Sequence, residues 1–446
     1  MATYALIDGN SFYASCQMAF DPSLWQKPVV VLSNNDGCIV SANAKAKALD
    51  KQLTRSLGDG GYRAATPGSF MFQPYFKVKA LLEQHQTVAF SSNYELYADM
   101  SNRMHTIIGT FGPHQEIYSI DESFLNLTGL ESQDLTALGQ EIKQTVFQWL
   151  HLPVAVGIGA TKTLAKLANH LAKNDSNYQG VLDLNTLSPS TKNWVFKHTD
   201  VGKVWGVGKK MSANLKSNGI RTVYDLQQAN PGRIRRRYSI TLEKIVRELN
   251  GECCLSSQEL SNPKQQIISS RSFGQAVTDV KSMEQALVSH TANAAKKLRQ
   301  QNGVCDYITL YFKTDSFNRQ ASQYQPSHTL ALPYASDDTI LLAKAVKQGL
   351  RQIWRPGYPY KKAGVILSGL SPKGPVQQDC FLPAPDPVQH LKHERLMQLT
   401  DRINLIMGDH TLYHSSEGIK HKTSWQMNRN LMSGRYTTRW NELPKV

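Results

Sequence analysis

Long apolar runs, paired cysteines and internal repeats are all missing from this 446-residue chain. No apolar run approaches the ~18 residues of a membrane-spanning helix, and the first ten residues lack the charged-then-apolar order of a secretory leader. The six cysteines contain no C-x-x-C pair, and only Cys253 and Cys254 are close together. Neither a zinc site nor a disulfide framework is indicated. We therefore expect a protein of the reducing cytoplasm with no membrane contact.

Two nucleotide-binding motifs are present only in incomplete form. The stretch V-G-I-G-A-T-K-T (156–163) lacks the glycine that a P-loop places directly before Lys-Thr, because Thr161 stands there. Gly206 and Gly208 lack the third glycine and the following acid of a dinucleotide fingerprint. Neither a P-loop nor a dinucleotide fold is predicted.

An excess of acid is confined to the front of the chain. Residues 1–190 carry 13 basic and 16 acidic side chains, residues 191–320 carry 21 and 10, and residues 321–446 carry 16 and 9. This imbalance indicates chemistry in the front part and a grip on a polyanion in the back part. Nucleic acid is the polyanion that we favour, although binding to a ribosome or a membrane surface would give the same imbalance.

Strand and helix patterns alternate through the first 190 residues. Apolar runs predict buried strands at 27–32 and 152–159, and helical spacing predicts helices at 41–49, 94–108 and 163–173. This mixture is typical of an α/β or α+β catalytic core.

The rest of the chain is predicted to form further helices and strands. A glycine-containing turn at 205–208 leads into a helix that ends at Asn218-Gly219. Beyond a polar linker we expect helices near 283–301 and 338–353 and strands at 308–312 and 363–367, followed after residue 371 by a loose connector and tail.

The stretch Y-S-I-D-E-S-F (118–124) places two acids between strand-like segments. A tight hairpin would put Asp121 and Glu122 at its tip, where both carboxylates can turn toward one point. Asp8 ends the first strand, so three carboxylates meet if those strands are neighbours. Divalent cations relieve such repulsion, and two Mg²⁺ ions about 3.5–4 Å apart support nucleotidyl transfer.

Simpler roles for these acids remain open at this point. Asp8 can be the N-cap of a helix that follows the strand, and the hairpin acids can be solvated turn residues.

A series of stretches, in order along the chain, resembles one enzyme family. They are D-G-N-S-F-Y-A-S-C (8–16), N-N-D-G-C-I-V (34–40), S-S-N-Y-E-L-Y-A-D-M-S (91–101), Y-S-I-D-E-S-F, T-K-T-L-A-K-L-A-N-H (161–170), V-W-G-V-G (204–208), S-R-S-F-G (270–274) and R-Y-T-T-R (435–439). Together they resemble the Y-family translesion DNA polymerases, and within that family the UmuC type. The resemblance covers nearly the whole chain.

The resemblance implies an α+β multidomain fold arranged as a right hand. The implied domains are a palm (1–19 and 94–185), small fingers (20–93, with a Gly-rich insertion at about 54–69), a helix-hairpin-helix thumb (186–251), a linker (252–268), a separate little finger (269–371) and a C-terminal tail (372–446).

The family's site residues carry over to matching positions. Asp8, Asp121 and Glu122 would be catalytic and hold two Mg²⁺ ions, with the Gly9 carbonyl as an additional ligand. The implied nucleotide-binding residues are Phe12 under the sugar, Tyr13 as the steric gate against ribose, and Ser41, Lys47 and Lys173 at the triphosphate. The implied DNA-binding residues are Gly206, Gly208, Lys209, Lys210 and Arg271. Without the motifs, core packing would explain the aromatic pair, and a solvated surface would explain the lysines.

Some positions depart from the family pattern. Asn10 stands where many members have a second acid, and Ala44 stands where many have a tyrosine. The peptide Q-Q-D-C-F (Gln377 to Phe381) occupies the place of a sliding-clamp-binding peptide, but Gln378 and Cys380 replace the expected aliphatic residues. Clamp binding is therefore expected to be weak.

The resemblance implies error-prone DNA synthesis across damaged template bases, in the course of SOS mutagenesis. It further implies primer–template DNA and dNTPs as substrates, and a processed UmuD-like dimer and a RecA filament as partners. Two alternatives are a non-catalytic DNA-binding scaffold subunit of a damage-response complex and a palm-type nucleotide cyclase that needs no template. The three carboxylates disfavour the first, and the basic back part disfavours the second.

Overall fold

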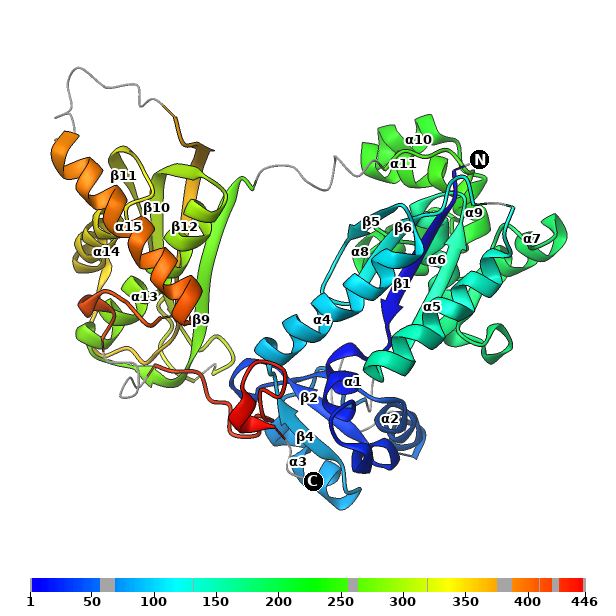
Figure 1. Cartoon of the computed structure of the whole chain (residues 1–446), viewed down its shortest axis with the longest axis horizontal. Helices are drawn as coiled ribbons and strands as arrows, with labels where there is room; N and C mark the ends of the chain where they lie inside the picture. The colour runs from blue at the N-terminus through cyan, green and yellow to red at the C-terminus, as the bar shows by residue number, and fades with distance from the viewer. Residues whose placement is uncertain are drawn as a thin grey trace. The chain divides into compact units, whose positions relative to one another are not determined.

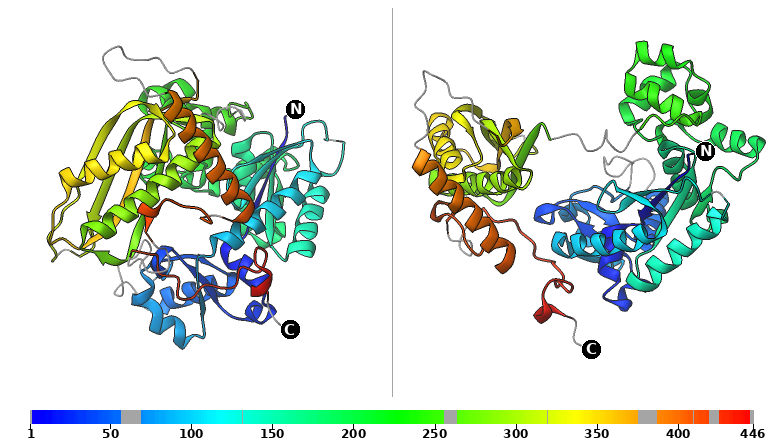
Figure 2. Two further views of the ribbon diagram at one scale, coloured as in Figure 1. Left: turned by 60° about the vertical axis from the view of Figure 1, so that its left-hand side comes forward. Right: turned by 45° about the horizontal axis from the view of Figure 1, so that its top comes forward.

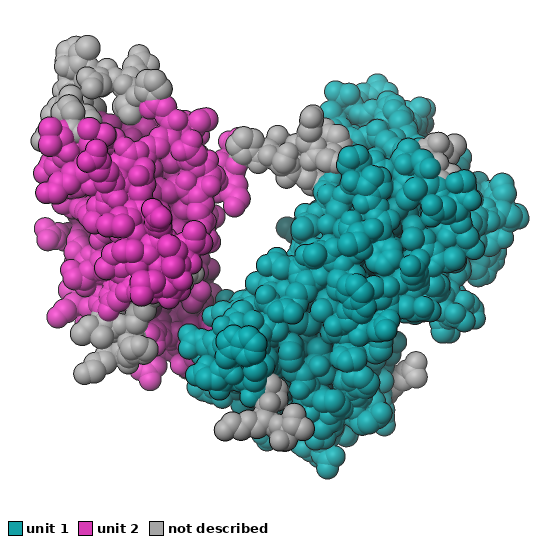
Figure 3. All heavy atoms as spheres, in the orientation of Figure 1, with its two compact units in different colours: residues 1–262, 430–446 teal, residues 263–429 magenta. Residues whose placement is uncertain are grey.

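The chain divides into two compact units. The computed structural model describes residues 2–56, 69–130, 132–255, 264–318, 320–374, 387–408, 410–418 and 425–443. Unit 1 comprises Met1–Asn262 and Asn430–Val446, and unit 2 comprises Pro263–Arg429 (Figure 3). Most of the predicted Gly-rich insertion and the whole clamp-like peptide lie outside the described residues. The unit boundary falls within the predicted linker, but the return of the chain end to unit 1 was not predicted.

A five-stranded sheet forms the centre of unit 1 (Figure 1). Its strand order in the described chain is β5 (His114–Ile117), β6 (Glu122–Asn126), β1 (Tyr4–Gly9), β7 (Val154–Gly159) and β8 (Val181–Asp183). β7 and β8 are parallel, and the other neighbouring strands are antiparallel.

Helices cover both faces of this sheet. Ala5 and Ile7 of β1 belong to a core shared with α4 (Tyr94–Ile108) and α5 (Leu135–Leu150), whereas Leu6 packs with Ala165 of α6 (Lys162–Asn174) on the other face. Alternation along the strand therefore places Asp8 on the α6 side. Gly157 permits the close approach of α6, because a Cβ there would lie 2.0 Å from the Asn169 nitrogen.

A smaller three-stranded sheet follows β1 and α1 (Phe12–Met18) in the chain. Its described strands have the order β3 (Ile39–Ala42), β2 (Val29–Leu32) and β4 (Val88–Ser91), and the nearby helices are α2 (Ala44–Ser56) and α3 (Tyr75–Gln84). The prediction of a helix over 41–49 was wrong at its start. Ser41 and Ala42 pair with Val31 and Val30 of β2, and this pairing outweighs the helical propensity of the alanines.

Five helices complete the described part of unit 1 before the linker. They are α7 (Pro189–His198), α8 (Lys209–Ser217), α9 (Val223–Gln227), α10 (Pro231–Arg237) and α11 (Ile240–Leu249). α8 ends at its C-cap Asn218, which confirms the predicted stop at Asn218-Gly219. A separate apolar core joins these helices to α6.

Unit 2 is built on a four-stranded antiparallel sheet. Its order in the described residues is β11 (Ser327–Ser336), β10 (Gly303–Thr314), β12 (Tyr360–Pro372) and β9 (Gln266–Val277). α13 (Val280–Gln300) and α14 (Thr339–Ile353) pack side by side against it, as Figure 2 shows.

The predicted loose tail contains a long helix. α15 (Pro387–Met407) packs on unit 2, where Asp401 pairs with Arg299 of α13 and Glu394 pairs with Lys373. Its apolar residues do not follow a clear helical stripe, so sequence periodicity did not reveal it. Among the described residues, no helix combines the length and apolar composition needed to cross a bilayer.

Candidate active site

Two neighbouring strands and the turn before one of them carry the three acids. β1 pairs with β6 so that Asp8 lies opposite Glu122, and the Gly9 N–H donates to the Asp121 carbonyl at 2.8 Å. Residues 118–121 connect β5 to β6, so Asp121 ends the hairpin turn and Glu122 begins the strand. The predicted neighbourhood of the two acidic segments is confirmed.

A cavity of about 330 Å³ opens beside these acids. Its lining includes nine of the residues singled out in the sequence or adjacent to them, namely Asp8, Gly9, Ser11, Phe12, Tyr13, Ser41, Lys47, Asp121 and Lys173. Strand ends, the start of α1, β3 and the end of α6 therefore contribute to one site. Glu122 is not among the residues that line the cavity, although it lies opposite Asp8 in the sheet.

Lysines of α6 hold two of the carboxylates. Lys173 Nζ lies 2.5 Å from Asp8 Oδ1, and Lys166 Nζ donates to both carboxylate oxygens of Glu122 at 2.8 Å. The pKa of Asp8 is raised to about 6, because burial and the Glu122 carboxylate outweigh the lowering effect of Lys173. A cluster of negative charge is thus neutralised by ammonium groups.

Asp121 has its own set of neighbours, which are Ser119, Tyr13 and Cys16. Ser119 Oγ donates to its carboxylate at 2.7 Å, and its charge contributes to the raised pKa values of Tyr13 and Cys16, although burial is the larger cause in both. Among the described residues, no group of three His, Cys, Asp or Glu side chains is already arranged to hold a metal ion. Asp8 and Glu122 are paired instead with Lys173 and Lys166 of α6.

Tyr13 is braced by two further tyrosines. Its ring stacks on Tyr97 at a centroid distance of 4.6 Å and an angle of 14°, and it meets the Tyr94 ring edge-on at a centroid distance of 6.0 Å. Phe12 is 3% exposed and belongs to the core of the sheet. Tyr13 is therefore a rigid wall of the cavity, while Phe12 anchors that wall in the core.

Cations and hydroxyls line the remaining side. Lys47 Nζ donates to Ser11 Oγ at 2.8 Å, and its pKa is lowered by burial and by Lys173. Ser41 Oγ donates to the Ser11 carbonyl and accepts from the Ala14 N–H, so its hydroxyl is already bonded to the start of α1. Ser41 thus supports the cavity wall.

Sequence reasoning missed Lys166 and its aromatic surroundings. The Lys166 ammonium lies 4.6 Å from the centre of the Tyr118 ring and 5.5 Å from that of Trp205, and the Trp205 indole N–H donates to the Tyr118 hydroxyl. Its position seven residues before Lys173, on the same face of a helix, was an available signal. Trp205 belongs to V-W-G-V-G, so this turn packs against Phe124 of β6.

The predicted DNA-binding residues lie outside the cavity. Gly206 has φ +82° and approaches Ile245 closely, so a glycine is required there, and Gly208 caps α8. Lys209 and Lys210 begin α8. Arg271 lies on β9 in unit 2.

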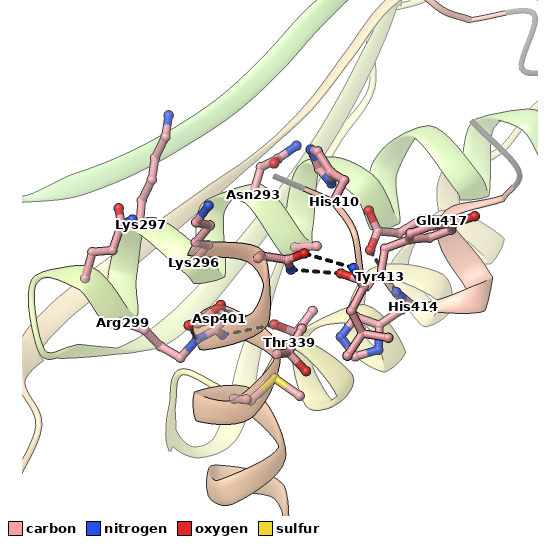
Figure 4. Close-up of a pocket in the computed structure, with 16 residues that line it drawn as sticks. Asn293, Lys296, Lys297, Arg299, Thr339, Asp401, His410, Tyr413, His414 and Glu417 are labelled. Atoms are coloured by element: carbon pink, nitrogen blue, oxygen red, sulfur yellow. Dashed lines mark hydrogen bonds and ion pairs between the residues drawn. The ribbon is translucent and has the colours of Figure 1, made fainter. Parts of the chain in front are cut away.

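Unit 2 has a cavity of its own, of about 270 Å³, between α13, α15 and residues 410–417 (Figure 4). Arg299 points to Asp401 and forms two hydrogen bonds with its carboxylate, at 2.7 and 3.0 Å. The side chain of Asn404 donates to the Leu412 carbonyl and accepts from its N–H, which ties the loop to α15. These pairs make the region a docking seam between α15 and the rest of unit 2.

Comparison with known proteins finds relatives along nearly the whole chain. The impB/mucB/samB family model matches residues 7–52 and 61–170, its C-terminal domain model matches 264–380, and a domain of unknown function (DUF4113) matches 394–446. The chain is 42% identical to Protein UmuC of Salmonella typhimurium over 99% of this chain and 100% of that protein. The chain belongs to the UmuC-like Y-family DNA polymerases.

Other relatives agree with this assignment. Protein MucB of Escherichia coli is 39% identical over 99% of both chains. Among solved structures, a chimera of the Y-family polymerases Dbh and Dpo4 matches with a TM-score of 0.59 at 18% identity, covering 83% of this chain and all of that one. This last likeness shows the fold.

Family membership fixes the activity of this UmuC-like chain. It is a DNA-directed DNA polymerase that carries synthesis across damaged template bases in SOS mutagenesis, and it acts on template DNA with a divalent metal.

Proposed function

We propose that the cavity between β1, α1, β3 and α6 is the nucleotidyl-transfer site, and that Asp8, Asp121 and Glu122 hold two Mg²⁺ ions there. The pairing of Asp8 with Glu122, next to Asp121 at the end of the hairpin, supports this most directly. When bound, such ions lower the pKa of the primer 3′-hydroxyl and stabilise the leaving oxygen.

The donor set suits a hard cation. Three carboxylates and the Gly9 carbonyl are oxygen ligands of the kind that Mg²⁺ prefers. The ammonium groups of Lys173 and Lys166 balance the negative charge of Asp8 and Glu122 while no metal ion is bound, at 2.5 and 2.8 Å from their carboxylate oxygens. We infer that these lysines exchange their carboxylate contacts for substrate or water when ions bind.

The cations of the cavity suit a triphosphate. Lys47 and Lys173 line the same cavity from α2 and α6, and each lowers the electrostatic cost of bringing phosphate charge next to the acids. Ser41 supports this wall through its backbone bonds. Tyr13 would exclude a ribose 2′-hydroxyl, and Phe12 would lie beneath the sugar.

The DNA would be held by contacts that read no bases. The turn before α8 and the first residues of that helix would bind backbone phosphates through their N–H groups and ammonium groups. The residues concerned are Gly206, Gly208, Lys209 and Lys210. Arg271 on β9 would add a phosphate contact from unit 2. The domain boundaries given above, from palm to tail, are part of this proposal.

Partner proteins are proposed on the family relationship alone. A processed UmuD-like dimer and a RecA filament would assemble with the chain, and a sliding clamp would bind only weakly through Gln377–Phe381.

Replacement of Asp121 by Asn tests the site. The change removes one negative charge but keeps the size of the side chain, so primer extension should fall by at least about a thousandfold. Binding of primer–template DNA, measured by fluorescence anisotropy, should stay within about twofold because the phosphate contacts are elsewhere. The exposed Asp21, replaced by Asn, is the matched control. Extension at a native rate by Asp121→Asn would defeat the assignment.

A further inference from the structure

The end of the chain lies on unit 1. Residues 430–443, which we name the strap, lie beside the end of β4 and the start of α4 (Figure 1). The Ser91 N–H donates to the Leu431 carbonyl, and the Leu431 N–H donates to Ser91 Oγ, both at 3.0 Å. The Asn430 N–H donates to Asp36 Oδ2 at 2.9 Å. The strap therefore begins with one backbone–backbone hydrogen bond and two bonds from its N–H groups to side-chain oxygens.

Asn93 is the point where the strap meets α4. It is fully buried, and its Oδ1 accepts from the Leu96 N–H as the N-cap of the helix. Its amide nitrogen faces the strap, at 3.2 Å from the Ser433 carbonyl, 3.0 Å from Ser433 Oγ and 3.1 Å from the Gly434 carbonyl. The Asn93 side chain thus caps the start of α4 and is itself held in place by the strap.

The strap is fixed beyond this point as well. The ring of Tyr436 packs on Phe20 at a centroid distance of 5.0 Å, and Arg435 pairs with Glu442 inside the strap. Asn93 is therefore held between two anchors, one at Leu431 and one at Tyr436.

The first turn of α4 carries the tyrosines that brace the cavity wall. Tyr94 follows the N-cap directly, and the Tyr97 N–H donates to the Asn93 carbonyl at 3.0 Å. Both rings pack on Tyr13, and the Tyr97 hydroxyl accepts from Gln17 at 2.8 Å. Contacts therefore run without a gap from the strap through Asn93 to the face of Tyr13.

We propose that the strap positions Tyr13 for the exclusion of ribonucleotides. Ser433 and Gly434 act through Asn93 and the first turn of α4, and they are positioning residues because they touch neither the nucleotide nor the reacting atoms. This gives the last part of the region matched by a domain of unknown function a role in sugar selection. The inference rests on the proposed role of Tyr13 as the gate.

Loss of the strap contacts would act through geometry. Without acceptors, the buried Asn93 amide is left unsatisfied, so the N-cap turns toward other partners and the first helical turn loosens. A displaced Tyr13 ring would leave room for the 2′-hydroxyl group of a ribonucleotide. Insertion of deoxynucleotides depends less on this wall, so the sugar preference should change more than the rate.

The test compares single-nucleotide insertion of a dNTP and the matching rNTP by the full-length chain on an undamaged primer–template. Asn93→Asp keeps the capping oxygen but sets a carboxylate against two carbonyls. Gly434→Val leaves α4 intact and displaces the strap, because a Cβ there would lie 2.4 Å from the Tyr436 ring. Each change should lower the dNTP-to-rNTP ratio of kcat/KM by about tenfold or more.

Two controls separate sugar selection from general damage. Trp440→Ala alters a side chain of the strap that is 90% exposed, and Asn230→Asp makes the same chemical change at the N-cap of α10. Both should keep the ratio within about twofold of native. In a Tyr13→Ala background, Asn93→Asp should lower the ratio no further, because both changes act on one wall.

The outcomes divide cleanly. If Tyr13→Ala lowers the ratio while Asn93→Asp and Gly434→Val both keep it, the strap only stabilises the fold and the proposal is overturned, whatever happens to melting temperature or rate. If Tyr13→Ala itself keeps the native ratio, the gate assignment fails and takes this inference with it.

Discussion

Burial sets the protonation of single side chains in both units. It raises the pKa of Asp8 and of Tyr97 in unit 1, and it lowers the pKa of His290 in unit 2 to about 4, with a smaller contribution from Arg271. His290 is 4% exposed, its Nδ1 lies 3.3 Å from Ser269 Oγ, and its Nε2 has no hydrogen-bond partner among the described residues. Protonation of the His290 imidazole is therefore unfavourable in the folded unit.

His290 should make unit 2 sensitive to acid. The unfolded chain binds a proton on this imidazole near pH 6.5, but the folded unit binds it only near pH 4, so its contribution to stability falls as pH drops through this window. Between pH 7.5 and 5 the free energy of unfolding should fall by about 2 kcal/mol on this account. Urea unfolding of the native chain and of His290→Gln at both pH values measures the difference.

The exposed His114, replaced by Gln, is the control for this experiment and should leave the pH dependence unchanged. An equal loss of stability on acidification in the native chain and in His290→Gln would show that the imidazole is not held neutral.

At the scale of elements, α6 organises the proposed catalytic site. Lys166 and Lys173 are two turns apart and lie on the same face of the helix. The Lys166 ammonium group contacts Glu122, and the Lys173 ammonium group contacts Asp8. Trp205 and Tyr118 hold Lys166 from the other side. In the proposed site, α6 thus supplies the positive charge that balances Asp8 and Glu122 before metal ions or phosphates bind.

Lys166→Gln should strengthen divalent-ion binding. The change removes a cation that competes for Glu122, so the Mn²⁺ concentration at half-saturation should fall by about three- to tenfold. Electron paramagnetic resonance of free Mn²⁺ measures this without catalysis. Lys166→Arg should stay near native, as should Lys45→Gln at an exposed lysine that contacts Gln26. Weaker Mn²⁺ binding by Lys166→Gln would contradict the competition.

Elements with strong local patterns could be predicted. α4, α6 and α8 have regular apolar spacing and clear caps, and the predicted ranges agree with the structure to within a few residues. β3 was missed because its pairing with β2 decides its conformation. α15 was missed because its ion pairs with Arg299 of α13 and with Lys373 are not visible in its own periodicity.

At the scale of the whole molecule, the sequence indicated that the strands carrying Asp8 and Glu122 could be neighbours, but it did not indicate that the chain end returns to unit 1. The sequence placed Asp8 at the end of a strand and Glu122 at a hairpin, and the pairing of β1 with β6 sets the two residues opposite each other. By contrast, Ser433 lies 340 residues from Asn93, and no local pattern links positions so far apart. The same holds for Lys166, whose partner Glu122 is known only once α6 packs on the sheet.

Charge is also divided at the scale of the whole chain. Residues 1–190, which include the residues lining the cavity, have a net charge of −3, and residues 191–320, which include the helices after β8 and the start of unit 2, have a net charge of +11. A polymerase that must follow any template benefits from this arrangement, because a positive surface holds DNA without reading it.

The number of divalent ions held by the full-length chain tests the central assignment most directly. With primer–template DNA and a non-hydrolysable dNTP bound, titration with Mn²⁺ should show about two tight ions per chain, and Asp8→Asn or Asp121→Asn should remove at least one of them. An unchanged number of tight ions in both variants would contradict a shared metal site at the ends of β1 and β6.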